Sequence, residues 1–293
     1  MVDIRYHIYS LAAVFLALAV GIVIGSAFAR SYPSSDTGRR TIARYEQDMR
    51  VLKAEIVRAT EDAGAHEATA RNCLEFCRAV LPVAVKDKLA WRNVALVQTG
   101  DADELTGAVR QALELAGAKV TSVTRISPKY PFDDRVRINS LLASGTIPSD
   151  GEGLSAQSKL LGVVAAAVFQ GKYAEVLEKL EQAGVADFSG DYYRLNKLVV
   201  LVGGASGEGR ADRVDTPLIQ ELQRLGASVV GCEATDAEVS YVPKWRSAGI
   251  STVDNADQSI GQLALIYALR GEKGSFGLKP TADRLFPQTL ETR

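Results

Sequence analysis

The residues best suited to metal or redox chemistry are three cysteines, Cys73, Cys77 and Cys232. Cys73 and Cys77 are four residues apart, so on a helix they share one face, where soft thiolates could bind Cu(I). The same spacing suits two small apolar side chains packed in a helical interface, because free cysteine behaves as a small hydrophobe. Both interpretations stay open: we expect no cofactor, and copper is the metal that these thiols bring into question.

Histidine, the commonest catalytic base, is scarce in this chain. Only His7 and His66 occur, so residues 67–293 contain none. This excludes Ser-His-Asp catalysis, Cys-His catalysis and His-ligated zinc from that part of the chain. We also find no paired carboxylates and no activated nucleophile, and we therefore expect a protein that is not an enzyme.

A glycine-rich stretch, 203–209 (GGASGEG), directly follows an apolar run. Backbone amides of such a loop can cradle a phosphate, which would make the domain a ligand- or nucleotide-binding α/β module. However, the spacing matches neither G-x-G-x-x-G nor the Walker pattern, and Glu208 would repel a phosphate. A surface loop is the simpler interpretation.

Acidic residues follow a second apolar run, at Glu233, Asp236 and Glu238. At the carboxyl edge of a sheet they could bind a cation or a basic partner, whereas the simpler interpretation is a solvated turn. The whole chain carries 34 basic and 35 acidic residues, a formal net charge of −1. With no global positive field, nucleic-acid binding is not expected.

The element that precedes all of these residues is apolar. Residues 8–29 contain no charged side chain, and as a helix they would span about 33 Å, enough to cross a bilayer. We therefore predict a single-pass anchor in the cell membrane over residues 1–30. The alternative is a cleaved signal peptide, because Ala27-Phe28-Ala29 has the small-x-small form of a cleavage site, but the apolar run is longer than a usual signal core.

One row of this helix is made of small residues, namely Ala13, Ala17, Gly21 and Gly25. The four-residue spacing ends in a G-x-x-x-G pair, which lets two helix backbones approach closely in lipid. This row is our candidate transmembrane dimer face. Small residues are also simply common in membrane helices, so the row alone leaves self-association open.

A heptad pattern follows a short polar linker (31–38), and it predicts a coiled-coil stalk over residues 39–81. Pro82 is expected to end the stalk helix. In a parallel pair Asp48 would attract Lys53 of the partner helix, whereas Asp62 would repel Glu67. The best-formed part of the seam comprises Ile42, Tyr45, Met49, Leu52 and Ile56, and its weaker continuation comprises Ala59, Ala63, His66, Ala70, Cys73, Cys77 and Val80.

The periodicity then changes to that of an α/β domain, predicted over residues 90–271 and followed by a tail (272–293). A strand–helix–strand unit at 93–98, 102–115 and 119–124 is repeated at 197–202, 212–225 and 227–232. Further helices are expected at 154–169, 173–183 and 259–270, and a further strand at 250–253. This alternation predicts a Rossmann-like, mainly parallel three-layer fold with a duplicated βαβ unit.

Residues near both ends of the chain carry a family resemblance. Residues 2–19 (VDIRYHIYSLAAVFLALA), together with Gly274-Ser275-Phe276-Gly277 and Asp283-Arg284-Leu285-Phe286-Pro287 near the end, resemble the bacterial copper-transporter MctB family. The resemblance implies an envelope protein with its globular domain outside the cytoplasm and a part in copper efflux or homeostasis. Arginines after the anchor (Arg30, Arg39, Arg40, Arg44) would instead favour a cytoplasmic domain; we follow the family.

The sequence leaves three candidate functions, which we rank. The first is a non-enzymatic, dimeric envelope scaffold or regulator that pairs with itself or with a coiled-coil partner protein. The second is copper transport or homeostasis, as the family name implies, and the third is the ligand-binding module described above.

Overall fold

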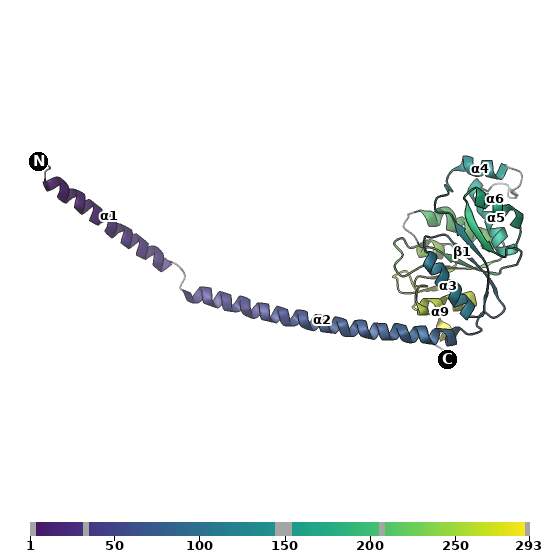
Figure 1. Cartoon of the computed structure of the whole chain (residues 1–293), viewed down its shortest axis with the longest axis horizontal. Helices are drawn as coiled ribbons and strands as arrows, with labels where there is room; N and C mark the ends of the chain where they lie inside the picture. The colour runs from purple at the N-terminus through teal and green to yellow at the C-terminus, as the bar shows by residue number, and fades with distance from the viewer. Residues whose placement is uncertain (1–3, 32–34, 144–153, 205–208, 291–293) are drawn as a thin grey trace. The chain divides into compact units, whose positions relative to one another are not determined.

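The computed structural model describes residues 4–31, 35–143, 154–204 and 209–290, and the chain divides into two compact units, residues 1–71 and 72–293 (Figure 1). The first unit contains α1 (Ile4–Ser31) and most of α2 (Ser35–Val85). Within α1, the 23 residues His7–Ala29 are long and apolar enough to cross a membrane. The predicted N-terminal apolar helix is therefore confirmed.

Helix α2 is longer than the sequence predicts, because it runs through Pro82 to Val85 instead of ending at Leu81. Proline has no N–H and its ring crowds the carbonyl of Arg78, which together cost about 3 kcal/mol inside a helix. Leu81 and Val85, on either side of it, are buried in the core of the second unit. Burying such side chains stabilises by about 1.5–3 kcal/mol each, which offsets the cost of the proline.

The second unit, which we call the head (residues 72–293), is built on a seven-stranded sheet with the order β3-β2-β1-β4-β5-β6-β7. All neighbouring strands are parallel except β3, which is antiparallel to β2. The predicted mainly parallel α/β sheet is confirmed. The strands are β1 (Asn93–Gln98), β2 (Lys119–Ile126), β3 (Ala186–Gly190), β4 (Leu198–Val202), β5 (Ser228–Cys232), β6 (Ser251–Val253) and β7 (Ser275–Phe276).

The duplicated unit is present. The first copy is β1, α3 (Asp103–Leu115) and β2, and the second is β4, α7 (Thr216–Arg224) and β5, with a π-helical turn at Ala211–Asp215 before α7. Each helix is followed by a glycine with positive φ, Gly117 (82°) and Gly226 (90°), a conformation that glycine adopts at little cost. The two copies therefore have the same order of elements and end their helices in the same way.

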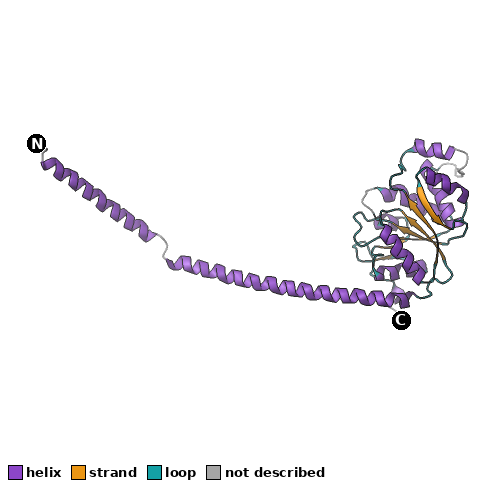
Figure 2. Ribbon diagram, in the orientation of Figure 1, coloured by secondary structure: helices purple, strands orange, loops and turns teal. Residues whose placement is uncertain are grey.

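Helices cover both faces of the sheet (Figure 2), because alternate side chains of each strand point to opposite faces. On β1, Val94 and Leu96 belong to one core, whereas Ala95 and Val97 belong to the other. The first core also contains α3, α9 (Ser259–Leu269) and the last turns of α2. The second contains α5 (Ala156–Gln170), α7 and α8 (Val242–Ser247).

Several elements differ from the sequence expectations. The predicted helix at 173–183 is a 3-10 turn (Ala174–Val176) followed by α6 (Leu177–Gln182), and α4 (Arg135–Ala143) was not predicted. Strand β3 was also missed. The tail from residue 272 contributes β7, whose Phe276 is buried, and a 3-10 turn at Gln288–Leu290.

Candidate functional site

The strand order reverses at β1. This strand pairs with β2 on one side and with β4 on the other. In open α/β sheets, ligands bind beyond the carboxyl ends of the strands at such a point. Thr99 and Gly100 follow β1 here, and Gly203 and Gly204 follow β4. The glycine-rich stretch is thus placed where a ligand-binding loop would be.

Protein atoms occupy the space between Gly100 and Gly204 and around Gly203. A Cβ atom at Gly100 would lie 2.5 Å from the carbonyl oxygen of Gly204, so the loops after β1 and β4 touch. A Cβ atom at Gly203 would lie 2.5 Å from Cζ2 of Trp245 and 2.7 Å from Cδ2 of Tyr241. These glycines are therefore explained by close packing, while residues 205–208 of the stretch lie outside the described residues.

A buried carboxyl lies beneath this packing. Asp215, at the end of the π-helical turn, is fully buried, and its Oδ2 accepts hydrogen bonds from Thr99 Oγ1 (3.1 Å) and Trp245 Nε1 (2.7 Å). Its Oδ1 has no hydrogen-bond partner among the described residues. Burial raises the pKa of Asp215 to about 7. Sequence reasoning missed this group, because nothing local marks Asp215 as buried.

The nearby cation is also committed to protein groups. Arg210 Nε donates to the carbonyl of Thr99 (2.5 Å), and its Nη2 donates to the carbonyls of Ile126 (2.8 Å) and Ser127 (3.2 Å). Burial is the main cause that lowers the pKa of Arg210. Its guanidinium therefore links the ends of β1 and β2. A phosphate that bound to Arg210 would have to displace these carbonyl oxygens.

The acidic residues after β5 do not form one site. Glu233, expected in a solvated turn, is instead fully buried and accepts hydrogen bonds from Ser240 Oγ (2.6 Å), the Tyr241 amide (2.8 Å) and Lys279 Nζ (2.6 Å). The expectation was wrong for Glu233 because the chain returns from residue 279 to pair with it. Asp236 and Glu238 are exposed.

Asp236 lines an open pocket of about 660 Å³ with Asp101, Asp103, Glu104 and Asp257. Asp257 there accepts hydrogen bonds from the amide and the hydroxyl of Thr235. Across the described ranges, His, Cys, Asp and Glu form no group of three or more that could hold a metal ion. The pocket is thus a solvated acidic surface.

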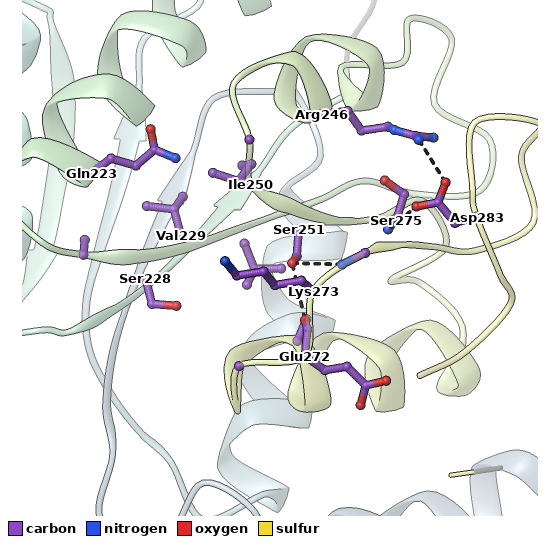
Figure 3. Close-up of a pocket in the computed structure, with 16 residues that line it drawn as sticks. Gln223, Ser228, Val229, Arg246, Ile250, Ser251, Glu272, Lys273, Ser275 and Asp283 are labelled. Carbon is purple, nitrogen blue, oxygen red and sulfur yellow. Dashed lines mark hydrogen bonds and ion pairs between the residues drawn. The ribbon is translucent and has the colours of Figure 1, made fainter. Parts of the chain in front are cut away.

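A second pocket, of about 450 Å³, opens at the amino ends of β5, β6 and β7 (Figure 3). Its polar groups contact one another: Arg246 pairs with Asp283 (2.9 Å), Asp283 accepts from the Ser275 amide (3.1 Å), and Ser251 accepts from the Gly274 amide (3.3 Å). This is the edge opposite to the one where α/β sheets bind ligands. We interpret these contacts as fixing β7 and the returning tail.

The three cysteines are not assembled into one site. Cys73 is exposed and Cys77 is half-buried, one turn apart on α2, whereas Cys232 is buried at the end of β5. Burial raises the pKa of the Cys232 thiol, which keeps it protonated and a poor metal ligand. Any thiolate chemistry therefore belongs to Cys73 and Cys77.

The predicted interaction faces on α1 and α2 are exposed within the chain. Ala13, Ala17, Gly21 and Gly25 lie on α1, and a Cβ added at either glycine meets no described atom within 4 Å. On α2 the large apolar side chains of the stalk seam, Ile42, Tyr45, Met49, Leu52 and Ile56, are each between 50% and 67% exposed. Within the chain, no other described element covers this row of large apolar side chains.

An apolar groove, which sequence reasoning missed, lies where α2 enters the head. It measures about 260 Å³. We call it the base groove; it is lined by Phe76, Cys77, Val80, Leu81 and Ala84 of α2, by Ser259, Ile260 and Leu263 at the start of α9, and by Phe286. The sequence does contain a signal for it, because the positions that flank the seam are apolar at Phe76 and Leu81, whereas such positions are often charged.

Comparison with known proteins identifies the family. The chain matches the family model described as "Copper transport outer membrane protein, MctB" over residues 1–287. It belongs to the MctB family. The chain is 27% identical over 311 residues to a copper transporter MctB of Mycobacterium bovis, covering 94% of this chain and 96% of that protein. It is 26% identical over 318 residues to the copper transporter MctB of Mycobacterium leprae, covering 95% and 96%. Together with the apolar helix α1, MctB membership indicates association with a membrane.

Proposed function

We propose that this MctB-family protein is a non-enzymatic envelope scaffold or regulator that works as a parallel homodimer. In this proposal α1 is a retained single-pass anchor in the cell membrane, the α2 helices of two copies pair, and the heads lie outside the cytoplasm. The observation that carries it is the exposed heptad seam of α2, whose large apolar side chains have no cover within the chain.

The direction of pairing follows from the anchor. Two copies held in one membrane by α1 emerge on the same side, so their α2 helices run parallel. In that arrangement Asp48 lies beside Lys53 of the other copy. Glu67 would face Asp62 of the other copy, but it also pairs with Arg71 of its own helix (2.8 Å), which offsets part of the repulsion.

Disulfide trapping in native membranes tests the pairing. In a Cys73→Ser, Cys77→Ser background, Leu52→Cys is expected to give a disulfide-linked dimer on mild oxidation, because seam residues of two parallel helices meet. Ala54→Cys, two residues away and off the seam, is the matched control. Equal cross-linking of both variants, or none of either, would contradict a paired seam.

Labelling of a cysteine away from the seam tests the topology. In the Cys73→Ser, Cys77→Ser background, an impermeant maleimide added to intact spheroplasts is expected to label Val136→Cys and not the background alone, since Val136 is exposed on α4 and Cys232 is buried. Labelling only after lysis would place the head in the cytoplasm. Sequencing of the mature amino terminus completes the test, because a chain starting near Arg30 would have lost its anchor.

Copper handling is the alternative function, favoured by the names of the relatives and by the two thiols on α2. Cys73 and Cys77 both fall on the seam, so a parallel pair would bring four thiols to one interface, a donor set suited to Cu(I). One apolar helix per copy offers no polar lining for an ion path, so this version concerns binding of copper rather than conduction.

Anaerobic Cu(I) titration of the full-length protein tests this alternative. Tight binding that is lost in Cys73→Ser, Cys77→Ser and kept in Cys232→Ala would support it. A wild-type protein that does not compete with a Cu(I) chelator would remove it. The third candidate, a phosphate-binding module, gains no support, because Gly203 and Gly204 are accounted for by packing.

A further inference from the structure

Part of the base groove is lined by residues of α2 that continue the heptad pattern of the stalk. Counted in the heptad register of the stalk, Cys77 and Ala84 occupy a positions and Val80 a d position, and all three line the groove. The register therefore continues, without a skip, from Ile42 to the last turn of α2 inside the head. A second α2 helix that paired along this register would therefore also lie over the groove.

The flanking positions change character at this point. Phe76 is at g and Leu81 at e, positions that are often Glu or Lys in coiled coils. In a parallel pair, the g residue of one helix lies beside the e residue five places further along the other helix. Phe76 of one copy is thereby placed next to Leu81 of the second copy, and Leu81 lines the base groove beside α9.

Exposure and size fit this occupant. Phe76 is 68% exposed in the single chain, although it is a large apolar side chain. An apolar cavity of about 150 Å³ already holds a benzene ring, so the base groove, at about 260 Å³, accommodates a phenylalanine ring. Its other wall is formed by Ile260 and Leu263 of α9, which are only partly buried.

We propose that the base groove is a docking site for a second copy of this chain, which inserts its Phe76 ring between Leu81 and α9. The inference rests on the parallel pairing proposed above, and it extends the dimer interface from the stalk into the head. By two-fold symmetry each copy gives one ring and receives one. The two heads are then held in a fixed orientation rather than carried independently.

Heterotypic cross-linking tests this contact. Two full-length chains with different tags, both lacking Cys73 and Cys77, are co-expressed: one carries Phe76→Cys and the other Leu263→Cys. A short bis-maleimide is expected to give a doubly tagged dimer. Replacing Leu263→Cys by Val136→Cys, an exposed site on α4, is expected to give none.

The outcomes separate this inference from the proposed function. If Leu52→Cys cross-links but Phe76→Cys never reaches Leu263→Cys, the docking site is overturned while the paired stalk stands. If neither cross-links, both fall. A Phe76→Cys product that contains another protein and never a second copy also overturns the inference.

Affinity provides a second measurement. Phe76→Ser is expected to weaken the full-length dimer in detergent by about tenfold or more, because a buried aromatic ring is lost. Val83→Ser is the matched control: Val83 is also at g and is more exposed, but the position opposite it, residue 88, lies beyond the end of α2. Equal weakening by both changes would refute a specific site for Phe76.

Discussion

Trp245 Nε1 donates a 2.7 Å hydrogen bond to Oδ2 of Asp215, and both side chains are fully buried. The indole ring also packs against Gly203, where ligands bind in many α/β sheets. One side chain therefore occupies the space beside Gly203 and holds the only buried carboxyl whose pKa rises to about 7 among the described residues. This relationship gives the head a pH-dependent stability.

The stability of the head should fall as pH rises through the range in which Asp215 ionises. The pKa is about 7 in the folded state against an ordinary aspartate value of 3.8, so the native state binds more protons between these values. Its contribution to the free energy of unfolding therefore declines by about 2–3 kcal/mol from pH 5 to pH 8. Asp215→Asn is expected to lose this decline.

Urea unfolding at pH 5 and pH 8 measures the difference. The chain has two tryptophans, and Trp91 is 98% exposed, so a Trp91→Phe background isolates the emission of Trp245. If Asp215→Asn and its parent show the same change in unfolding free energy between the two pH values, Asp215 does not titrate as stated.

The Glu233–Lys279 ion pair should be important for stability. Lys279 Nζ lies 2.6 Å from Glu233 Oε1, with side-chain exposures of 18% and 0%. Lys279→Met would leave a buried carboxylate unpaired, and it is expected to cost about 2–4 kcal/mol. Lys244→Met, which breaks an exposed pair with Asp212 of 2.9 Å, should cost less than about 1 kcal/mol. Equal losses in thermal unfolding would show that burial does not distinguish the two pairs.

Gly203→Ala tests whether packing explains the glycine-rich stretch. The added methyl group would overlap Trp245 and Tyr241, so we expect a loss of about 1–3 kcal/mol in unfolding free energy. Gly107→Ala is the control, since a Cβ there meets no described atom within 4 Å and the site is inside α3; it should stabilise by about 0.5–1 kcal/mol. A neutral Gly203→Ala would reopen the phosphate-loop interpretation.

The small-residue row on α1 should contribute to pairing in lipid. Gly21→Leu adds bulk on this row without a clash inside the chain, and it is expected to weaken self-association in vesicles on the order of tenfold, measured by energy transfer between labelled copies. Ala19→Leu adds similar bulk on the opposite face and should leave it unchanged. If the two variants behave alike, the row is not a dimer face.

Much of the head was readable from sequence, because β1, β4 and β5 are short apolar runs between turn residues. Strand β3 was not, since Ala186–Gly190 is an edge strand with three exposed residues and no apolar run. The end of α2 was misjudged because the local rule for Pro82 was overridden by burial of its neighbours.

The polar contacts of the candidate site were harder to foresee. Asp215 lies 30 residues before Trp245, and Glu233 lies 46 residues before Lys279. Neither pairing leaves a local pattern, so a solvated turn was expected where the fold makes a buried ion pair. The family and the long helix α2 could be predicted because the residues that indicate them are consecutive or periodic.

Pro82 has a mechanical consequence. The carbonyl of Arg78 lacks a helical donor, while Leu81 and Val85 on either side of the proline are fixed in the core. A tensile force along α2 reaches the sheet through the turn at residues 78–82, which lacks one helical hydrogen bond. We expect that turn to stretch first, which would leave the strands intact and make residues 78–82 the compliant joint of the molecule.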